Sequence, residues 1–497
     1  MTRGGTVLAA YALLALLVLP LYPHFVSPNE LSRWLLDASV IEHGTIEVTA
    51  TAPQLGPRFE DLAVVGSRMY SNKAPGTNLL SIAGYAIARP FTRALRPLVT
   101  AERLTAATLP LLLLGLLFLR LAKRWDVEPA RAATVLWVLF FATPLFAYGL
   151  LLFSHALVAA ALFGAWYFLY EERRDFVAGA LIGLAVAAEY PMAIPAAILL
   201  APIAGERRIL RAIAGGLPFA AALAAYHTAA FGGPFRNPYA FSKLAAYREL
   251  AEGGFLGIRA PSIVNLGKLL ADPAYGLLVF APVLLLALPA LVAMRKNLTH
   301  AAWWTLALTP LSILILYAGY PYWHGGWNVG PRYLVPAIPF LVAPLLFRKS
   351  DLLESLLSGW SALAVALTTL VFPFVPQAFA MPWMSLAAPL LRQGLVAPNL
   401  AHLLARPVAI AVPFAIVLVA AIVASRPRLL PFLAVGIVAA VLVGREWPAD
   451  RERTTIQRAY IAAVYFERHG ALGSNAPPQL LRRRELELTL PPPSWPF

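Results

Sequence analysis

Three short polar segments hold the residues that could do chemistry, and the first follows the N-terminal apolar stretch. Glu30, Arg33 and Asp37 are spaced three and four residues apart, so they are neighbours on one face of a helix. A carboxylate can accept a proton from a hydroxyl group, and a guanidinium can hold an anion. An equally good interpretation of Glu30 is structural, because Ser27, Pro28 and Glu30 have the spacing of a helix-capping box.

The second segment, Tyr70-Ser71-Asn72-Lys73-Ala74-Pro75-Gly76, is rich in turn-forming residues. It is expected to return the chain to the membrane, with Tyr70 near the substrate. Lys73 could bind an anion here. Considered alone, it is more often an interfacial lysine whose aliphatic part lies in lipid.

The third segment spans residues 320–333. Most of its aromatic side chains are expected to form an interfacial belt, while Trp323, His324 and Trp327 are candidates to contact a substrate. Arg332 is unusual, because the orientation rule disfavours arginine at the outer mouth of a span. Its guanidinium can hold a phosphate through two hydrogen bonds, and the three glycines of the segment allow backbone N–H groups to approach the same anion.

Other polar residues give weaker signals. Four residues could converge as metal ligands: His24, His155, Glu189 and His324. Their spacing matches no local metal motif, so a divalent metal is left open. The sequence contains neither a Walker loop nor a dinucleotide-binding fingerprint, which leaves a cytoplasmic nucleotide site unsupported.

The composition determines which elements must position these residues. Of 497 residues 60% are hydrophobic and 13% charged, and the mean hydropathy is +0.69, which is typical of a polytopic helical membrane protein. The chain has no cysteine, so disulfides and thiolate sites are excluded. A net charge of +15 is compatible with nucleic-acid binding, but the basic residues lie in short clusters between apolar stretches, where they orient membrane proteins.

We predict an all-α fold with about 13 transmembrane helices. The predicted spans are residues 6–23, 103–121, 132–150, 152–170, 209–231, 273–294, 301–320, 332–347, 355–375, 405–425 and 429–444, together with two arms within 176–204. These two arms enter and return with a turn at Glu189, because a single crossing would put the flanking basic clusters on opposite sides. The basic clusters are assigned to the cytoplasm, and the first span is expected to remain uncleaved.

This topology places the N-terminus in the cytoplasm and most polar residues outside. We divide the chain into a transmembrane domain, residues 1–444, and a periplasmic tail, residues 445–497. The first periplasmic loop, residues 24–102, begins with an amphipathic helix that is expected to lie along the membrane surface and to end at Gly44. The remaining outer loops are residues 232–272, 321–331 and 376–404.

The first outer loop resembles that of the GT-C glycosyltransferases, above all protein O-mannosyltransferases and the bacterial aminoarabinose transferases that modify lipid A. The resemblance rests on Pro28-Asn29-Glu30, Arg33, the helix ending at Gly44 and the turn around Lys73. Asn29 replaces the first acid of their Asp-Glu pair, Arg33 comes one residue late, and Ala74 replaces a proline. The segment from Gly325 to Tyr333 resembles one found in uncharacterised bacterial GT-C-like proteins.

This resemblance implies a sugar transferase in the bacterial inner membrane. Its donor would be a polyprenyl-phosphate sugar at the outer face, and its acceptor a hydroxyl group of a lipid, glycan or protein. Lys73, Arg332 and Arg33 would stabilise the departing phosphate, and Glu30 would be the base, with Asp37 and Glu189 as alternatives. Direct displacement by one base inverts the anomeric centre.

Three other functions fit the sequence less well. An oligosaccharide ligase or polymerase would use lipid diphosphate donors. A transporter or flippase normally has ionisable groups within its spans and repeated halves, and no clear repeat is present. A noncatalytic membrane scaffold would need none of these polar segments.

Overall fold

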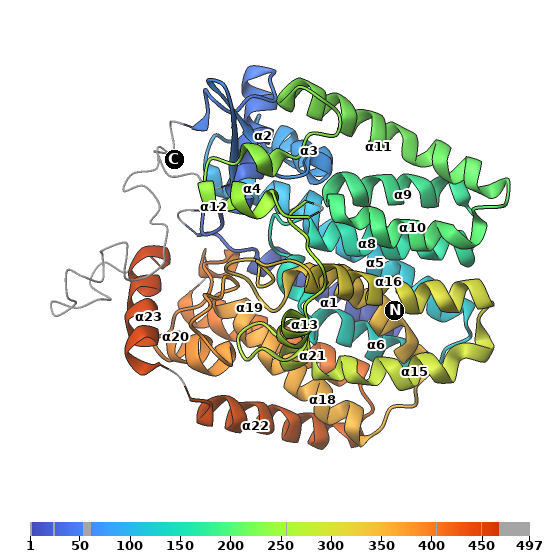
Figure 1. Cartoon of the computed structure of the whole chain (residues 1–497). Helices are drawn as coiled ribbons and strands as arrows, with labels where there is room; N and C mark the ends of the chain where they lie inside the picture. Colours follow the sequence, from blue (N-terminus) through green and yellow to red (C-terminus); the bar gives the residue numbers. More distant parts are fainter. Residues whose placement is uncertain are drawn as a thin grey trace.

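The computed structural model describes residues 2–22, 25–52, 61–254, 256–403, 405–448 and 450–466. It is a mostly helical bundle (Figure 1). In chain order the α-helices are α1 (Arg3–Val18), α2 (Pro28–His43), α3 (Asn78–Ala88), α4 (Leu95–Arg103), α5 (Leu109–Arg124), α6 (Pro129–Phe141), α7 (Leu145–Tyr148), α8 (His155–Tyr170), α9 (Asp175–Ala188), α10 (Ala193–Leu200), α11 (Arg208–Phe231), α12 (Ala245–Ala251), α13 (Ile263–Ala271), α14 (Leu277–Phe280), α15 (Ala287–Ala293), α16 (His300–Ala318), α17 (Ile338–Val342), α18 (Leu352–Ala362), α19 (Thr368–Val371), α20 (Ala388–Arg392), α21 (Arg406–Ala424), α22 (Leu430–Glu446) and α23 (Arg451–Tyr465).

The chain is a multi-pass membrane protein by the length and hydropathy of these helices. Within the described residues six helical stretches are long and apolar enough to cross a bilayer: Leu95–Arg124, Arg208–Phe231, His300–Ala318, Leu352–Val371, Arg406–Ala424 and Pro427–Glu446. Shorter apolar helices accompany them. Each predicted span coincides with a helical stretch. The number of 13 crossings itself stays a prediction.

Proline interrupts two of the predicted spans. The stretch from residue 332 to 347 consists of the 3-10 turns η9 (Arg332–Ala337) and η10 (Ala343–Phe347) on either side of α17. Pro336, Pro339 and Pro344 lie within it, and each lacks the N–H that an α-helix would need at that position. Pro282 likewise separates α14 from α15.

The segment from 176 to 204 has the predicted two arms. Helix α9 ends at Ala188, Glu189 is extended at φ −150°, and a 3-10 turn leads into α10. The arms lie side by side (Figure 1). Helix α9 also packs closely on α11, because a Cβ atom at Gly179 would lie only 1.8 Å from the carbonyl oxygen of Ala212.

The first outer loop differs from the prediction in two respects. Helix α2 begins after Ser27 and ends at Gly44 as expected, but residues 29–39 are buried instead of lying on a surface. The loop also contains a hairpin, β1 (Leu62–Val65) paired antiparallel with β2 (Arg68–Ser71), so the fold is not exclusively helical. Gly66 has φ +63° in the turn of this hairpin.

Partners for the polar face explain why α2 is buried. Helices α3 and α4 and the hairpin pack around it and supply hydrogen-bonding groups to its charged side chains. Ser32, for example, contacts the Ser71 hydroxyl at 2.8 Å. A polar helix face whose charged side chains have hydrogen-bond partners in this way can be buried at a tolerable cost.

The C-terminal region continues past α22 into α23. Arg458 of α23 donates to the carbonyl oxygen of Ser385 at 2.6 Å, and the Tyr465 ring packs against Phe372. Residue 445, where the tail is predicted to begin, lies in the last turn of α22, and the assignment of the tail to the periplasm stays a prediction. The basic run Arg482–Arg484 and His24 lie outside the described residues.

Candidate functional site

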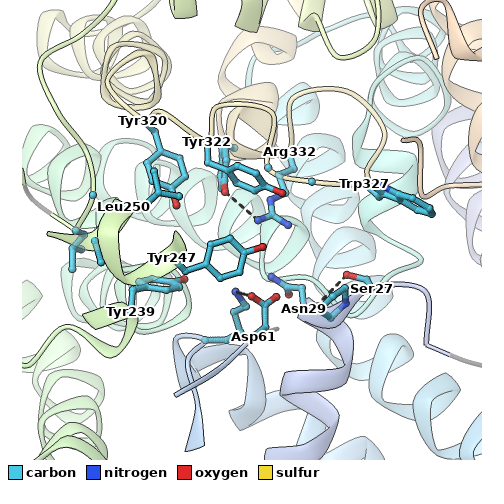
Figure 2. Close-up of a pocket in the computed structure, with 18 of the residues that line it drawn as sticks. Ser27, Asn29, Asp61, Tyr239, Tyr247, Leu250, Tyr320, Tyr322, Trp327 and Arg332 are labelled. Atoms are coloured by element: carbon cyan, nitrogen blue, oxygen red, sulfur yellow. Dashed lines mark hydrogen bonds and ion pairs between the residues drawn. The ribbon is translucent and has the colours of Figure 1, made fainter. Parts of the chain in front are cut away.

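A cavity of about 530 Å³ lies where several loops meet (Figure 2). It is lined by Val26, Ser27, Pro28, Asn29, Asp61, Lys73, Tyr239, Tyr247, Leu250, Ala251, Leu256, Gly257, Tyr320, Tyr322, Gly325, Gly326, Trp327, Arg332, Tyr333 and Tyr465. We call it the main cavity. Its lining comes almost entirely from loops that the sequence predicts to lie on the outer face.

Lys73 and Asp61 form an ion pair in this cavity. The lysine Nζ lies 2.9 Å from Asp61 Oδ1, and both side chains are largely buried. Lys73 lies two residues after the end of β2, and Asp61 directly precedes β1, so the hairpin brings them together. Burial lowers the pKa of Lys73, Asp61 opposes this effect, and Arg332 and Arg33 reinforce it. Lys73 therefore lies close enough to both arginines for their charges to act on it.

Arg332 projects from the first turn of η9 toward the same space. Its Nη2 donates to the Tyr333 hydroxyl at 3.0 Å, and its guanidinium lies 4.9 Å from the Tyr333 ring centroid and 5.7 Å from that of Phe153. The buried Nε has no hydrogen-bond partner among the described residues. A ligand acceptor could satisfy this donor, since unpaired buried donors are costly.

The glycines of the third segment shape the backbone beside Arg332. Gly325 and Gly326 have φ +72° and +87°, in the left-handed region that glycine adopts without strain. A Cβ atom at Gly325 would lie 2.5 Å from Arg332 Nε. Asn328 fixes this loop, because its Nδ2 donates to the carbonyl oxygens of His324 and Gly326 at 3.0 and 2.6 Å.

A smaller inner cavity of about 50 Å³ adjoins the main one and shares Asn29, Lys73 and Arg332 with it. Arg33 lines it and donates to Asn29 Oδ1 and to the Ala74 carbonyl oxygen, both at 3.1 Å. Glu189 and His155 also line it.

These two groups differ in their hydrogen bonding. Glu189 accepts a hydrogen bond from the Ser154 hydroxyl, which precedes α8. Neither ring nitrogen of His155 has a partner among the described residues. The two cavities together are lined by three cationic and two acidic side chains, so their net charge favours an anionic group.

The structure brings together several of the predicted site residues. Lys73, Arg332 and Trp327 line the main cavity, and Arg33 and Glu189 line the inner one. Trp323 and His324 line a separate cavity instead. Tyr70 lines none of these cavities, and its ring packs on Phe231.

The two predicted catalytic acids lie elsewhere. Both carboxylate oxygens of Glu30 accept from the Arg103 guanidinium, at 2.8 and 2.9 Å, and one also accepts from the Leu152 amide at 2.7 Å. Ser27 caps α2 by accepting from the Asn29 amide. The Glu30 carboxylate accepts from Arg103 and Leu152, and not from the Ser27 amide as a capping box would require. Asp37 is buried and accepts from Asn78 Nδ2 at 2.7 Å.

Sequence reasoning missed Asp61 and the tyrosines of the 232–272 loop. Asp61 belongs to no recognisable motif, and only the hairpin places it beside Lys73. Tyr239 stands in an ordinary loop, yet its ring centroid lies 5.4 Å from the Lys73 ammonium. Asn29, which the sequence marks only as a replacement for an acid, lines both cavities. No group of three His, Asp or Glu side chains that could hold a metal is found in the described part of the chain.

Comparisons with known proteins yielded one structural likeness. No protein-family model matches the chain. No curated protein matches its sequence either. Its fold is similar to the crystal structure of ArnT from Cupriavidus metallidurans bound to undecaprenyl phosphate, with 15% sequence identity and a TM-score of 0.49 over 92% of this chain and 78% of that one.

Proposed function

We propose that the chain is an integral membrane glycosyltransferase that moves a sugar from a polyprenyl-phosphate donor to a hydroxyl acceptor at the outer face of a bacterial inner membrane. The observation that carries the proposal is the convergence of Lys73 and Arg332, from distant parts of the chain, in one cavity with Asp61. The lining loops are those predicted to lie outside, which supports an outer active site with a cytoplasmic N-terminus.

The cations suit a phosphate leaving group. When the glycosidic bond breaks, the phosphate gains negative charge, and fixed cations lower the energy of that transition state most when water is excluded. Arg332 presents an unpaired Nε and Lys73 a largely buried ammonium. Arg33 adds a third positive charge from the inner cavity.

We assign the general base to Asp61 in place of Glu30. Asp61 lines the main cavity, where an acceptor hydroxyl can reach it. Both oxygens of Glu30 are already bonded to Arg103, and Glu30 is fully buried. Transfer of the acceptor proton to Asp61, attack of its oxygen on the anomeric carbon and departure of the phosphate would occur in one displacement with inversion.

The aromatic lining suits the sugar. Tyrosines 239, 247, 320, 322 and 333 surround the main cavity and combine apolar ring faces with hydroxyl groups. A sugar has a C–H face and a hydroxyl rim, which match these two properties.

The test is donor consumption in native membranes, followed by mass spectrometry of polyprenyl-phosphate sugars. Wild type should consume a donor that persists with Lys73→Met and Arg332→Met at matched expression. Lys296→Met is the matched control, because Lys296 is exposed and distant in sequence from the cavity. Asp61→Asn should leave as much donor unconsumed as Lys73→Met and Arg332→Met do. If wild type leaves every donor unchanged but redistributes it across the bilayer, the chain is a flippase.

A further inference from the structure

A third cavity lies on the other side of the loop that walls the main cavity. It has a volume of about 230 Å³ and is lined by Asp272, Pro273, Ala274, Tyr275, Trp323, His324, Gln377, Ala378 and Ala380. We call it the outer cavity. Tyr322 and Gly325 line the main cavity while Trp323 and His324, between them in sequence, line the outer one. The loop is therefore a thin partition between the two spaces.

Three segments build this cavity, and hydrogen bonds between them fix its shape. The Tyr275 hydroxyl donates to the Val375 carbonyl oxygen at 2.7 Å, and the Asn328 amide donates to the same oxygen at 3.2 Å. The Met381 amide donates to the Pro273 carbonyl oxygen at 2.8 Å. These bonds use backbone and buried groups, so they leave the exposed lining available to a ligand.

The lining combines aromatic faces with neutral hydrogen-bonding groups. The Trp323 and Tyr275 rings meet edge to face with their centroids 6.3 Å apart, and the His324 ring is stacked on Tyr275. Gln377 is exposed and lies 2.7 to 2.9 Å from the His324 ring nitrogens. An amide and an imidazole can each donate to or accept from hydroxyl groups.

The charges of this cavity disfavour an anion. Burial, together with Arg332 and Lys268, lowers the pKa of His324 to about 4, so its ring is neutral at pH 7. Asp272 is the acidic residue of the lining, and its Oδ1 accepts from the amides of Ala274 and Tyr275. Since the donor phosphate is an anion, it belongs in the main cavity and not here.

We propose that the outer cavity binds a neutral pyranose ring of a glycan acceptor, next to the sugar whose hydroxyl enters the main cavity. This inference rests on the proposed function. That function allows the acceptor to be any compound with a hydroxyl group, and the inference narrows the acceptor to a glycan. A pyranose fits for two reasons: its C–H face packs on the partly exposed Trp323 ring, and its hydroxyls bond to Gln377 and His324.

The test uses the purified full-length protein in lipid nanodiscs and saturation-transfer NMR with neutral disaccharides, maltose, cellobiose, lactose and chitobiose, as probes. At least one disaccharide should bind wild type. Trp323→Leu and Gln377→Leu should each weaken that binding by about fivefold or more, as expected for one lost contact. Trp304→Leu and Gln393→Leu are matched controls on exposed side chains elsewhere and should bind as wild type. Equal melting temperatures show that all four variants fold.

Two results would overturn the inference. One is that wild type binds none of the probes, and the other is that binding is lost with Lys73→Met but unchanged with Trp323→Leu and Gln377→Leu. The latter result would place the saccharide in the main cavity. Saccharide binding that depends on Trp323 and Gln377, in a protein that consumes no polyprenyl-phosphate sugar, would support the site and refute the proposed glycosyl transfer separately.

Discussion

Gly325→Ala tests whether the position of Arg332 matters for turnover. The new Cβ atom would lie 2.5 Å from Arg332 Nε and about 3 Å from its Cδ and Cγ, where ordinary contacts exceed 3.4 Å. The side chain must therefore move by about 1 Å, and a misplacement of that size can cost about 100-fold in rate. That loss corresponds to about 2.7 kcal/mol of transition-state stabilisation.

Gly326→Ala separates this effect from backbone strain. Both glycines have positive φ, so both alanine variants lose roughly 1 to 2 kcal/mol of stability. At Gly326 the nearest atom to the new Cβ is the Tyr322 hydroxyl, at 3.2 Å, and Arg332 is not within reach. The assay is the initial rate of donor consumption in native membranes at matched folded protein. Rates of the two variants that agree within about threefold would refute the role of Arg332 position.

The remaining predictions concern stability. Glu30→Gln leaves the Arg103 charge buried without its partner, which should reduce the free energy of unfolding by about 3 to 5 kcal/mol and lower the melting temperature. An unchanged melting temperature with complete loss of turnover would restore Glu30 as the base. Burial raises the pKa of Asp37 to about 7, so the folded state holds a proton that the unfolded state releases near pH 4. Stability should therefore fall as the pH rises from about 4 to 7, by up to about 4 kcal/mol, and melting curves of Asp37→Asn should show a smaller fall than those of wild type. Gly179→Val should lower the melting temperature, since its side chain would enter the α11 backbone, whereas Gly267→Ala, which meets open space, should not.

Local sequence was sufficient to predict the helices and to single out two of the cations that line the main cavity. Apolar stretches of the right length predicted the bundle, and the basic clusters predicted which loops would meet. Lys73 and Arg332 stood out because each is a cation next to turn-forming residues. Together with Arg33 and Glu189 they line two adjoining cavities, which agrees with the prediction that all these loops lie at the same end of the bundle.

The assignment of acids could not be predicted in the same way. Glu30 and Asp61 are both carboxylates in the first outer loop, and their difference arises from partners far along the chain. Glu30 meets Arg103 and the Leu152 amide, whereas Asp61 meets Lys73 across the hairpin. Since a helix with three charged residues has the same periodicity whether its polar face meets water or protein, the sequence predicted a surface helix where α2 is buried.

The loop from 320 to 333 connects both proposed binding sites through one backbone conformation. Because two consecutive glycines turn the chain with positive φ, Arg332 can approach Gly325 on one side while Trp323 and His324 face the other. Asn328 holds that conformation by bonding to two carbonyl oxygens of the loop. If both proposals hold, a change in the loop should act on the donor phosphate and on the acceptor glycan together. This explains why one short segment combines glycines, aromatic rings and a single buried arginine.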